Sequence, residues 1–325
     1  MTSAMASARS RSLAGAGFVV VAAACFGTLG PLSRFAGDAG VDSLTLVTWR
    51  AALGAVVVAT FITIGAVATG VRPASLRLVP VRDRWFMLAA AVANTVLNFA
   101  AFVAFERISI ALTLLVFYLY PAGVAVASTV WFGDRLDRVG WAALGVSLIG
   151  MTLVVAGAGA LGELDPLGIG LAFVAAIAQV FYVLAARHGF SHVPGPQAAM
   201  LTMAGAATLY LLIGLVAGTL AALAQPLASS AALWPVVLAG IVGAGIPTLC
   251  FITGIRRLGP SQAAILATIE PIVGVALAAW LLGEQPLPVQ LVGGALILGA
   301  AIVLQLRQLG AIAEHEAVGA TSAGP

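Results

Sequence analysis

Long apolar segments separated by short polar stretches recur along the whole chain. Each segment reaches or exceeds the roughly 20 residues with which an α-helix crosses the hydrocarbon core of a bilayer. An isolated open strand could not satisfy its backbone groups in lipid, so we expect each segment to be a helix. The segments cover residues 13–34, 43–68, 84–105, 109–132, 138–159, 166–187, 196–219, 233–255, 261–282 and 287–307. The pattern predicts an all-α integral membrane protein of ten transmembrane helices.

The composition agrees with a membrane protein and excludes a soluble one. Of the 325 residues, 62% are hydrophobic and 8% are charged, whereas a soluble domain carries about 25% charged residues. The net charge of +3 is small and the basic residues are spread along the chain, so no nucleic-acid-binding face is expected. Cys25 and Cys250 fall in apolar segments of different halves, which does not indicate a disulfide framework.

Arginine placement predicts the orientation, because cytoplasmic loops of membrane proteins are enriched in basic residues. With the N-terminus inside, the inner segments hold twelve arginines and the outer segments only Arg34 and Arg107. The inner ones are Arg9, Arg11, Arg72, Arg77, Arg82, Arg84, Arg135, Arg138, Arg187, Arg256, Arg257 and Arg307. We therefore expect a multi-pass protein of the cell (plasma) membrane with both termini cytoplasmic, as tails 1–12 and 308–325.

An internal repeat organises the ten predicted helices. At an offset of 150 residues, Arg107 matches Arg257, Pro121 matches Pro271, Gly133 matches Gly283 and Asp134 corresponds to Glu284. The segment 17–34 can also be laid over 170–187, which argues against a cleaved signal peptide at the N-terminus. We expect one repeat over 13–159 and a second over 160–307. Five helices per repeat is an odd number, so the two halves should be inverted, as in many secondary transporters.

The same residues carry a resemblance to a known family. The stretch 270–304, EPIVGVALAAWLLGEQPLPVQLVGGALILGAAIVL, and its counterpart from Tyr120 resemble the EamA-type members of the drug/metabolite transporter superfamily. Tyr120 stands where the second repeat has Glu270, and Arg50 sits where family members often carry arginine. The resemblance implies a transporter fold of inverted repeats and an exporting direction. It does not imply a substrate, since the superfamily is associated with amino acids, nucleotide sugars, cations and drugs.

Two charged residues lie inside predicted helices, where a charge is expensive and normally turned inward. Glu270 has three interpretations: a carboxylate that couples transport to protons, a counter-ion for a substrate ammonium, or a structural acid bonded to backbone freed by Pro271. Arg50 has a substrate carboxylate or Glu270 as natural partners, or its long side chain snorkels outward.

Polar side chains in the third, fourth and sixth segments complete the predicted substrate site. Asn94 and Asn98 are four residues apart and share a helix face. Gln179 and Tyr182 form a similar face, and both pairs would either bind substrate or hold helices together. Tyr118 and Tyr120 point about 200° apart on a helical wheel, so only one should face a cavity. We prefer Tyr120, because it is the repeat equivalent of Glu270; an aromatic packed in the core is the alternative.

Glycines and prolines mark candidate gates. The eighth segment holds Gly243, Gly245 and Pro247 close together, a run that permits a kink or unwound turn where protein covers the freed backbone. Close packing of small residues explains the glycines equally well. Pro121 and Pro271 are the other gating candidates, at equivalent positions of the two repeats.

These features favour a secondary transporter over the other function classes. The membrane segments contain no histidine and no acid pair, so we expect no enzyme activity, no metal site and no cofactor. The chain has no lysine and no nucleotide-binding loop, which argues against direct use of ATP. We expect export of a small organic metabolite, amino-acid-like or amphipathic, or of a drug. The expected partners are this substrate, the lipid bilayer and protons, and a homodimer is compatible with the sequence. A non-transporting scaffold or lipid-handling protein is the alternative.

Overall fold

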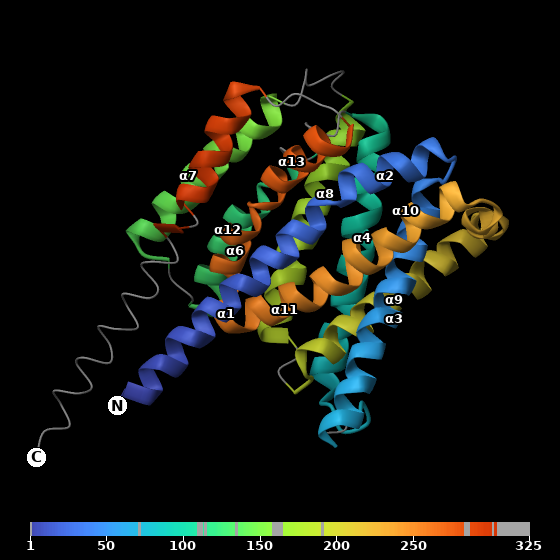
Figure 1. Cartoon of the computed structure of the whole chain (residues 1–325). Coiled ribbons are helices and arrows are strands. Elements are labelled where there is room, and N and C mark those ends of the chain that lie inside the picture. The colour runs from blue at the N-terminus through green and yellow to red at the C-terminus, as the bar shows by residue number, and fades with distance from the viewer. Residues whose placement is uncertain are drawn as a thin grey trace, which may run out of the picture.

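The computed structural model describes residues 2–70, 73–108, 113, 116–133, 136–157, 165–189, 192–282, 287–300 and 302–303. Every regular element in these residues is helical, and the helices form one bundle (Figure 1). The predicted C-terminal tail, Asp134, Glu163 and Glu284 lie outside the described residues.

The described residues of the first half form seven helical elements. They are α1 (Thr2–Gly27), α2 (Leu29–Asp38), α3 (Ser43–Thr69), α4 (Val81–Arg107), α6 (Tyr120–Ala127) with the π-helical turn η1 (Ser128–Phe132), and α7 (Arg138–Gly157). Asp42 caps the start of α3, because its carboxylate accepts a hydrogen bond from the Thr45 amide at 2.9 Å. Gly70 ends α3 with φ of 71°, a left-handed conformation that favours glycine.

The second half repeats this arrangement. Its elements are α8 (Pro166–Leu184) with the π-helical turn η2 (Ala185–Gly189), α9 (Gly195–Val216), the 3₁₀-helix η3 (Leu220–Ala228), α10 (Ser230–Gly240), the π-helical turn η4 (Ile241–Gly245), α11 (Ile246–Leu258), α12 (Pro260–Ala267), α13 (Glu270–Leu282) and a helix over 288–300. Asp165 caps α8 through the Leu167 amide at 3.0 Å and pairs with Arg107 at 2.9 Å. The Arg107 guanidinium and this amide hold the pKa of the exposed Asp165 carboxyl below its ordinary value.

Among the described residues, seven helical stretches are long and apolar enough to cross a membrane. They are Ser10–Asp38, Ser43–Thr69, Val81–Ala104, Pro166–Arg187, Gly195–Val216, Ser230–Leu258 and Pro260–Leu281. Two shorter apolar helices, Arg138–Leu153 and Pro288–Ala300, coincide with the fifth and tenth predicted segments. The fourth predicted segment is only partly described, through α6 and η1. The all-helical membrane architecture is therefore confirmed, whereas the count of ten crossings remains a prediction.

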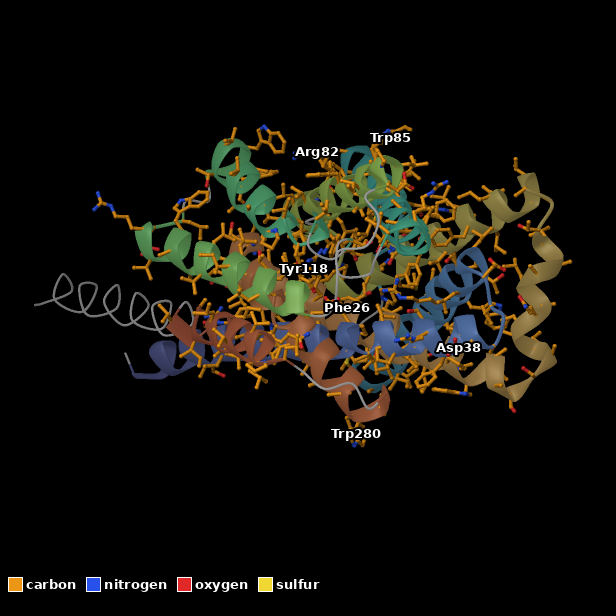
Figure 2. The ribbon with its side chains drawn as sticks, turned by 90° about the horizontal axis from the view of Figure 1, so that it is seen from above. Phe26, Asp38, Arg82, Trp85, Tyr118 and Trp280 are labelled. Carbon is orange, nitrogen blue, oxygen red and sulfur yellow. The ribbon has the colours of Figure 1, made fainter. Side chains whose placement is uncertain are left out.

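The outer surface of the bundle is apolar, as expected for contact with lipid. Figure 2 places Trp85 and Trp280 on the outside of the molecule, where they are 65% and 79% exposed. Phe26 and Tyr118 lie in the interior of the same view. Exposed tryptophans are unfavourable in water, whereas membrane proteins are enriched in tryptophan at the membrane–water interfaces.

Helix contacts between the two halves follow the repeat. Helix α1 packs along α11, α4 packs along α8, and α3 packs along α9. A Cβ placed on Gly15 would lie 2.9 Å from the Cβ of Arg257, and one on Gly168 would lie 3.1 Å from the Cβ of Arg107. The first contact joins α1 to α11, and the second is the corresponding contact between α8 and α4. Equivalent residues of the two halves therefore make equivalent contacts, as an approximate two-fold symmetry between the halves requires.

Both repeats also contain a helix break at the same position. The helix is interrupted by turns at 118–119 and 268–269, and α6 and α13 begin directly after them. Pro121 and Pro271 explain both breaks, since proline lacks an N–H and its ring clashes with the carbonyl four residues earlier. The break changes the direction of the side chains around it. The rings of Tyr118 and Tyr120 consequently lie 6.0 Å apart and both are buried, so the expectation that they diverge is wrong.

Candidate functional site

Arg50 joins the two halves of the protein in the bundle interior. Its side chain leaves α3 and is 8% exposed. The guanidinium donates from Nε and Nη2 to the Gly243 carbonyl oxygen in η4, at 3.1 and 3.0 Å. It also donates from Nη1 to the amide oxygen of Asn98 on α4. Because these bonds hold the guanidinium inside the bundle, the side chain does not snorkel outward. In the described part of the chain no carboxylate lies within ion-pair distance of Arg50.

The Gly243 carbonyl is available to Arg50 for a local reason. In an α-helix, a carbonyl accepts a hydrogen bond from the amide four residues later. For Gly243 that residue is Pro247, which has no N–H. Gly243 lies in the π-helical turn η4, and the guanidinium supplies two donors to its carbonyl where the α-helical amide donor is absent. Arg50 therefore stabilises the irregular turn η4 as well as occupying the interior.

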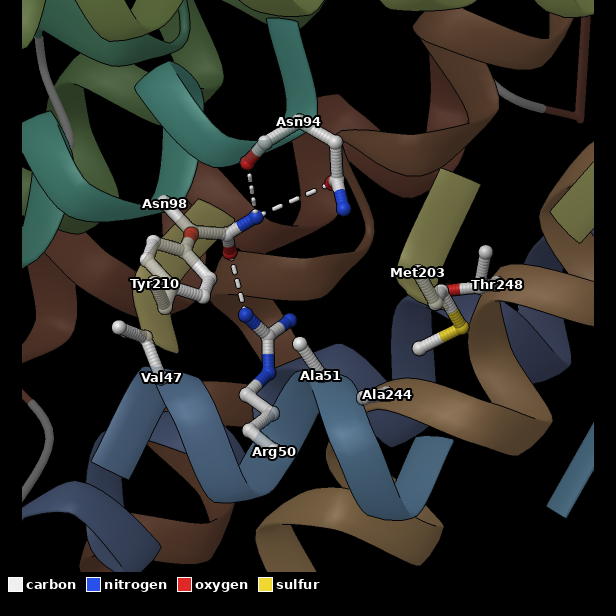
Figure 3. A pocket seen from close by; sticks show the side chains of 9 residues that line it. All are labelled: Val47, Arg50, Ala51, Asn94, Asn98, Met203, Tyr210, Ala244 and Thr248. Atoms are coloured by element: carbon white, nitrogen blue, oxygen red, sulfur yellow. Dashed lines mark hydrogen bonds between the residues drawn. The ribbon is translucent and has the colours of Figure 1, made fainter. Parts of the chain in front are cut away.

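Asn94 and Asn98 extend this cluster along α4. The Asn98 side-chain nitrogen donates to the backbone oxygen of Asn94 at 2.8 Å and to its side-chain oxygen at 3.1 Å. Figure 3 shows Arg50 reaching from α3 toward Asn98, with Asn94 one turn away. The amide pair fixes which atom Asn98 presents to Arg50: its nitrogen is used within α4, so its oxygen faces the guanidinium.

A small cavity adjoins the cluster. Its volume is about 20 Å³, which is room for about one water molecule. It is lined by Val47, Arg50, Ala51, Asn94, Asn98, Met203, Tyr210, Ala244 and Thr248, all drawn in Figure 3. Arginine, amides, a hydroxyl and a phenol thus surround a space that has no room for an organic solute.

A second polar group surrounds Glu270 at the start of α13. The Tyr118 hydroxyl lies near the Glu270 carboxylate but makes no hydrogen bond of normal geometry. The Tyr120 hydroxyl lies near the Gln179 side chain of α8. Phe117 packs on both tyrosines, with ring centroids 5.4 Å from Tyr118 and 5.2 Å from Tyr120. Glu270 is within electrostatic reach of Arg50 without forming an ion pair with it.

The predicted site residues therefore fall into two groups. Arg50, Asn94 and Asn98 form one hydrogen-bonded cluster, and Tyr120, Gln179 and Glu270 gather in the other. Tyr182 is buried, and its hydroxyl lies near Thr202 but makes no hydrogen bond of normal geometry among the described residues. Among the gating candidates, Gly243 is bonded to Arg50, Gly245 and Pro247 lie directly beyond it, and Pro121 and Pro271 mark the helix breaks.

Six of the nine cavity residues were not expected from the sequence: the apolar Val47, Ala51, Met203 and Ala244, and the polar Tyr210 and Thr248. Tyr210 lies in α9 and donates its hydroxyl to the Thr95 carbonyl at 3.0 Å; a phenol in an apolar segment was the available signal. Thr248 follows Pro247, where a hydroxyl near a broken helix is also a recognisable signal. Met203 is an ordinary apolar residue of α9, and nothing in the sequence distinguishes it.

Comparison with known proteins identifies the family. The model of the EamA-like transporter family matches residues 13–156 and again 166–306. The chain belongs to this family. Its two EamA repeats correspond to the two halves of the bundle, and the family consists of membrane transporters of the drug/metabolite type.

A solved structure shows the same fold. A chain titled "Crystal structure of protein" is 24% identical, superposes with a TM-score of 0.75, and is matched over 92% of this chain and 98% of its own length. No curated protein matches this sequence. The EamA assignment therefore rests on the family model, and the solved structure supports the fold.

Proposed function

We propose that this EamA protein is a secondary transporter that exports a small organic molecule from the cell by alternating access. The observation that carries the proposal is the Arg50 cluster, in which a buried cation of the first repeat is bonded to an irregular helix of the second. A scaffold has no need for a buried arginine that forms no ion pair with a described carboxylate, since a membrane-buried charge is costly. A transporter needs polar groups that connect its two halves, because such groups bind the substrate and change their contacts when it binds.

The residues have distinct proposed roles. Arg50, Asn94 and Asn98 bind polar groups of the substrate, with Tyr182 beside them. Glu270, Tyr120 and Gln179 form the second part of the site, and Glu270 exchanges a proton during the cycle. The turn η4 with Gly243, Gly245 and Pro247, and the breaks at Pro121 and Pro271, act as the points where the helices bend. The closed cavity corresponds to an occluded state between two open ones.

Flux through sealed vesicles tests this function. Purified protein would be reconstituted and loaded with radiolabelled amino acids, nucleosides, polyamines or amphipathic drugs, with and without a pH gradient. We expect saturable flux of one compound class, slowed by Arg50→Ala and made insensitive to the gradient by Glu270→Gln. Leu212→Ala, an exposed lipid-facing site, serves as the control.

Two results would redirect the proposal. Flux of Glu270→Gln with unchanged pH dependence would remove the proton role and leave transport intact. An absence of flux for every class, from protein that remains folded and monodisperse, would favour the scaffold or lipid-handling alternative.

A further inference from the structure

The Arg50 guanidinium holds one neutral oxygen with the edge that suits a carboxylate. Nε and Nη2 both donate to the single Gly243 carbonyl oxygen, at 3.1 and 3.0 Å. The same edge can bind two oxygens of a carboxylate through parallel charge-assisted hydrogen bonds. The Gly243 carbonyl and the Asn98 amide accept bonds from three of the five N–H donors of the cation, and neither acceptor carries a charge.

The cavity lies at the place where an anion would have to enter. Arg50, Asn98 and Ala244 all line it, and Ala244 follows Gly243 in the chain. A carboxylate approaching through this space would compete directly with the Gly243 carbonyl for Nε and Nη2. The carbonyl would then lose both guanidinium donors, and Pro247 has no amide hydrogen to offer in exchange.

We propose, building on the transport function above, that the substrate carries a carboxylate which displaces the Gly243 carbonyl from Arg50, and that this displacement releases η4. Substrate binding is thereby coupled to a change in the helix α10–η4–α11 of the second repeat. A carbonyl left without a donor in a membrane interior is unfavourable, so η4 must refold or rotate when the carboxylate binds. Because Pro247 offers no amide hydrogen, Arg50 has two roles: it binds the anion, and in the absence of the anion it stabilises η4.

The competition predicts an unusual effect of Pro247→Ala. Alanine restores an N–H four residues beyond Gly243, so the carbonyl no longer depends on Arg50 and the guanidinium edge becomes free. Because the carboxylate no longer has to displace the carbonyl, we expect carboxylates to bind at least about tenfold more tightly. Pro235→Ala is the matched control, since Pro235 lies inside α10 of the same helix but not four residues beyond Gly243.

Equilibrium binding to purified protein tests the inference independently of flux. The probes are butyrate, 3-phenylpropionate and L-leucine, each compared with its primary amide, and the readout is ligand-dependent thermal stability. We expect at least one carboxylate to stabilise the protein, its amide to have no effect, Pro247→Ala to tighten binding and Pro235→Ala to leave it unchanged. Arg50→Lys, which keeps the charge but loses the two-pronged edge, should weaken binding.

The outcomes separate this inference from the transport function. Equal stabilisation by carboxylates and amides, no stabilisation by any carboxylate, or unchanged affinity in Pro247→Ala would overturn the carboxylate exchange. If vesicles nevertheless transported an amide or a cationic compound, the transport function would stand without it. Tight carboxylate binding that responds to Pro247→Ala but is accompanied by no flux would support the exchange site and reject transport.

Discussion

At the scale of single residues, the neutrality of Asn98 keeps the Arg50 charge available. Asn98 accepts a hydrogen bond from the guanidinium without neutralising it. We expect Asn98→Asp to place a carboxylate against Arg50 and form an internal ion pair. This variant should lose substrate flux, because the cation is already paired, and its unfolding temperature should stay close to that of wild type, because it also loses both hydrogen bonds to Asn94. Thermal unfolding in detergent and vesicle flux measure the two effects.

The control for this prediction is Asn98→Leu. Leucine removes the acceptor and leaves the guanidinium with an unmatched donor in the interior, so both stability and flux should fall. The interpretation fails if Asn98→Asp transports as well as wild type.

Gln197 of α9 holds the segment between α3 and α4 through two hydrogen bonds to Ala74. Its side chain is buried, accepts a hydrogen bond from the Ala74 amide at 2.9 Å and donates one to the Ala74 carbonyl at 2.7 Å. Gln197→Ala would leave both backbone groups without partners, at a cost of about 1–3 kcal/mol. Thermal unfolding should show the loss. Gln225→Ala, which removes an exposed contact to the Gly40 carbonyl, should have a much smaller effect.

The sequence predicted the polar residues of the interior better than their partners. A charge or amide inside an apolar segment must face protein, so Arg50, Asn94 and Asn98 could be selected, and their spacing placed the two amides on one face. The bond from Arg50 to Gly243 could not be predicted, since it joins residues 193 positions apart. A missing amide at Pro247 indicates that a carbonyl is free, but not which distant donor reaches it.

At the scale of helices, small residues let α10 and η4 approach α3 closely. A Cβ on Gly240 would lie 2.5 Å from the Cβ of Leu53, and one on Gly245 would lie 2.8 Å from the Cβ of Val57. Of the two explanations for this glycine run, close packing is thus directly visible, and gating remains a proposal. Gly243 lies within this closely packed run, and its carbonyl also accepts hydrogen bonds from Arg50.

We therefore expect Gly240→Ala to force α10 away from α3. Overpacking of this kind costs about 1–3 kcal/mol, and the unfolding temperature should fall. Gly145→Ala is the matched control, since a Cβ there meets nothing within 4 Å in the described structure and alanine favours a helix. An equal loss of stability in both variants would show that the effect is not one of helix separation.

Helix breaks were only partly predictable at this scale. The apolar pattern predicted continuous helices over 109–132 and 261–282, with Pro121 and Pro271 only as gating candidates, whereas the structure has a turn beside each proline. The direction in which the chain continues after each break depends on packing. The helical wheel therefore failed for Tyr118 and Tyr120, which lie on either side of a turn rather than on one continuous helix.

At the scale of the whole molecule, the sequence offsets anticipated real contacts between the halves. Arg107 and Arg257 are equivalent at an offset of 150, and the overlay of 17–34 on 170–187 makes Gly15 equivalent to Gly168. The structure brings Gly15 to Arg257 and Gly168 to Arg107. Figure 1 shows the chain of α3 and that of α9 running in opposite directions, as an inverted repeat requires. The packing of each half against the other depends on contacts between residues far apart in the sequence. Only the repeat symmetry allowed part of this packing to be related to the sequence.

These two contacts provide a test of alternating access, because each joins the halves at a symmetry-related position. In a background without Cys25 and Cys250, one variant would carry Gly15→Cys with Arg257→Cys, and the other Gly168→Cys with Arg107→Cys. The Cβ separations of 2.9 and 3.1 Å need to increase by less than about 1 Å to suit a disulfide. Both contacts are formed in the closed structure, and an opening on either side must separate one of them. We therefore expect copper–phenanthroline oxidation of either variant to stop vesicle flux and a reductant to restore it. Persistent flux in fully cross-linked protein of both variants would mean that the halves do not move apart at these contacts, and a rocking motion of the two repeats would have to be abandoned.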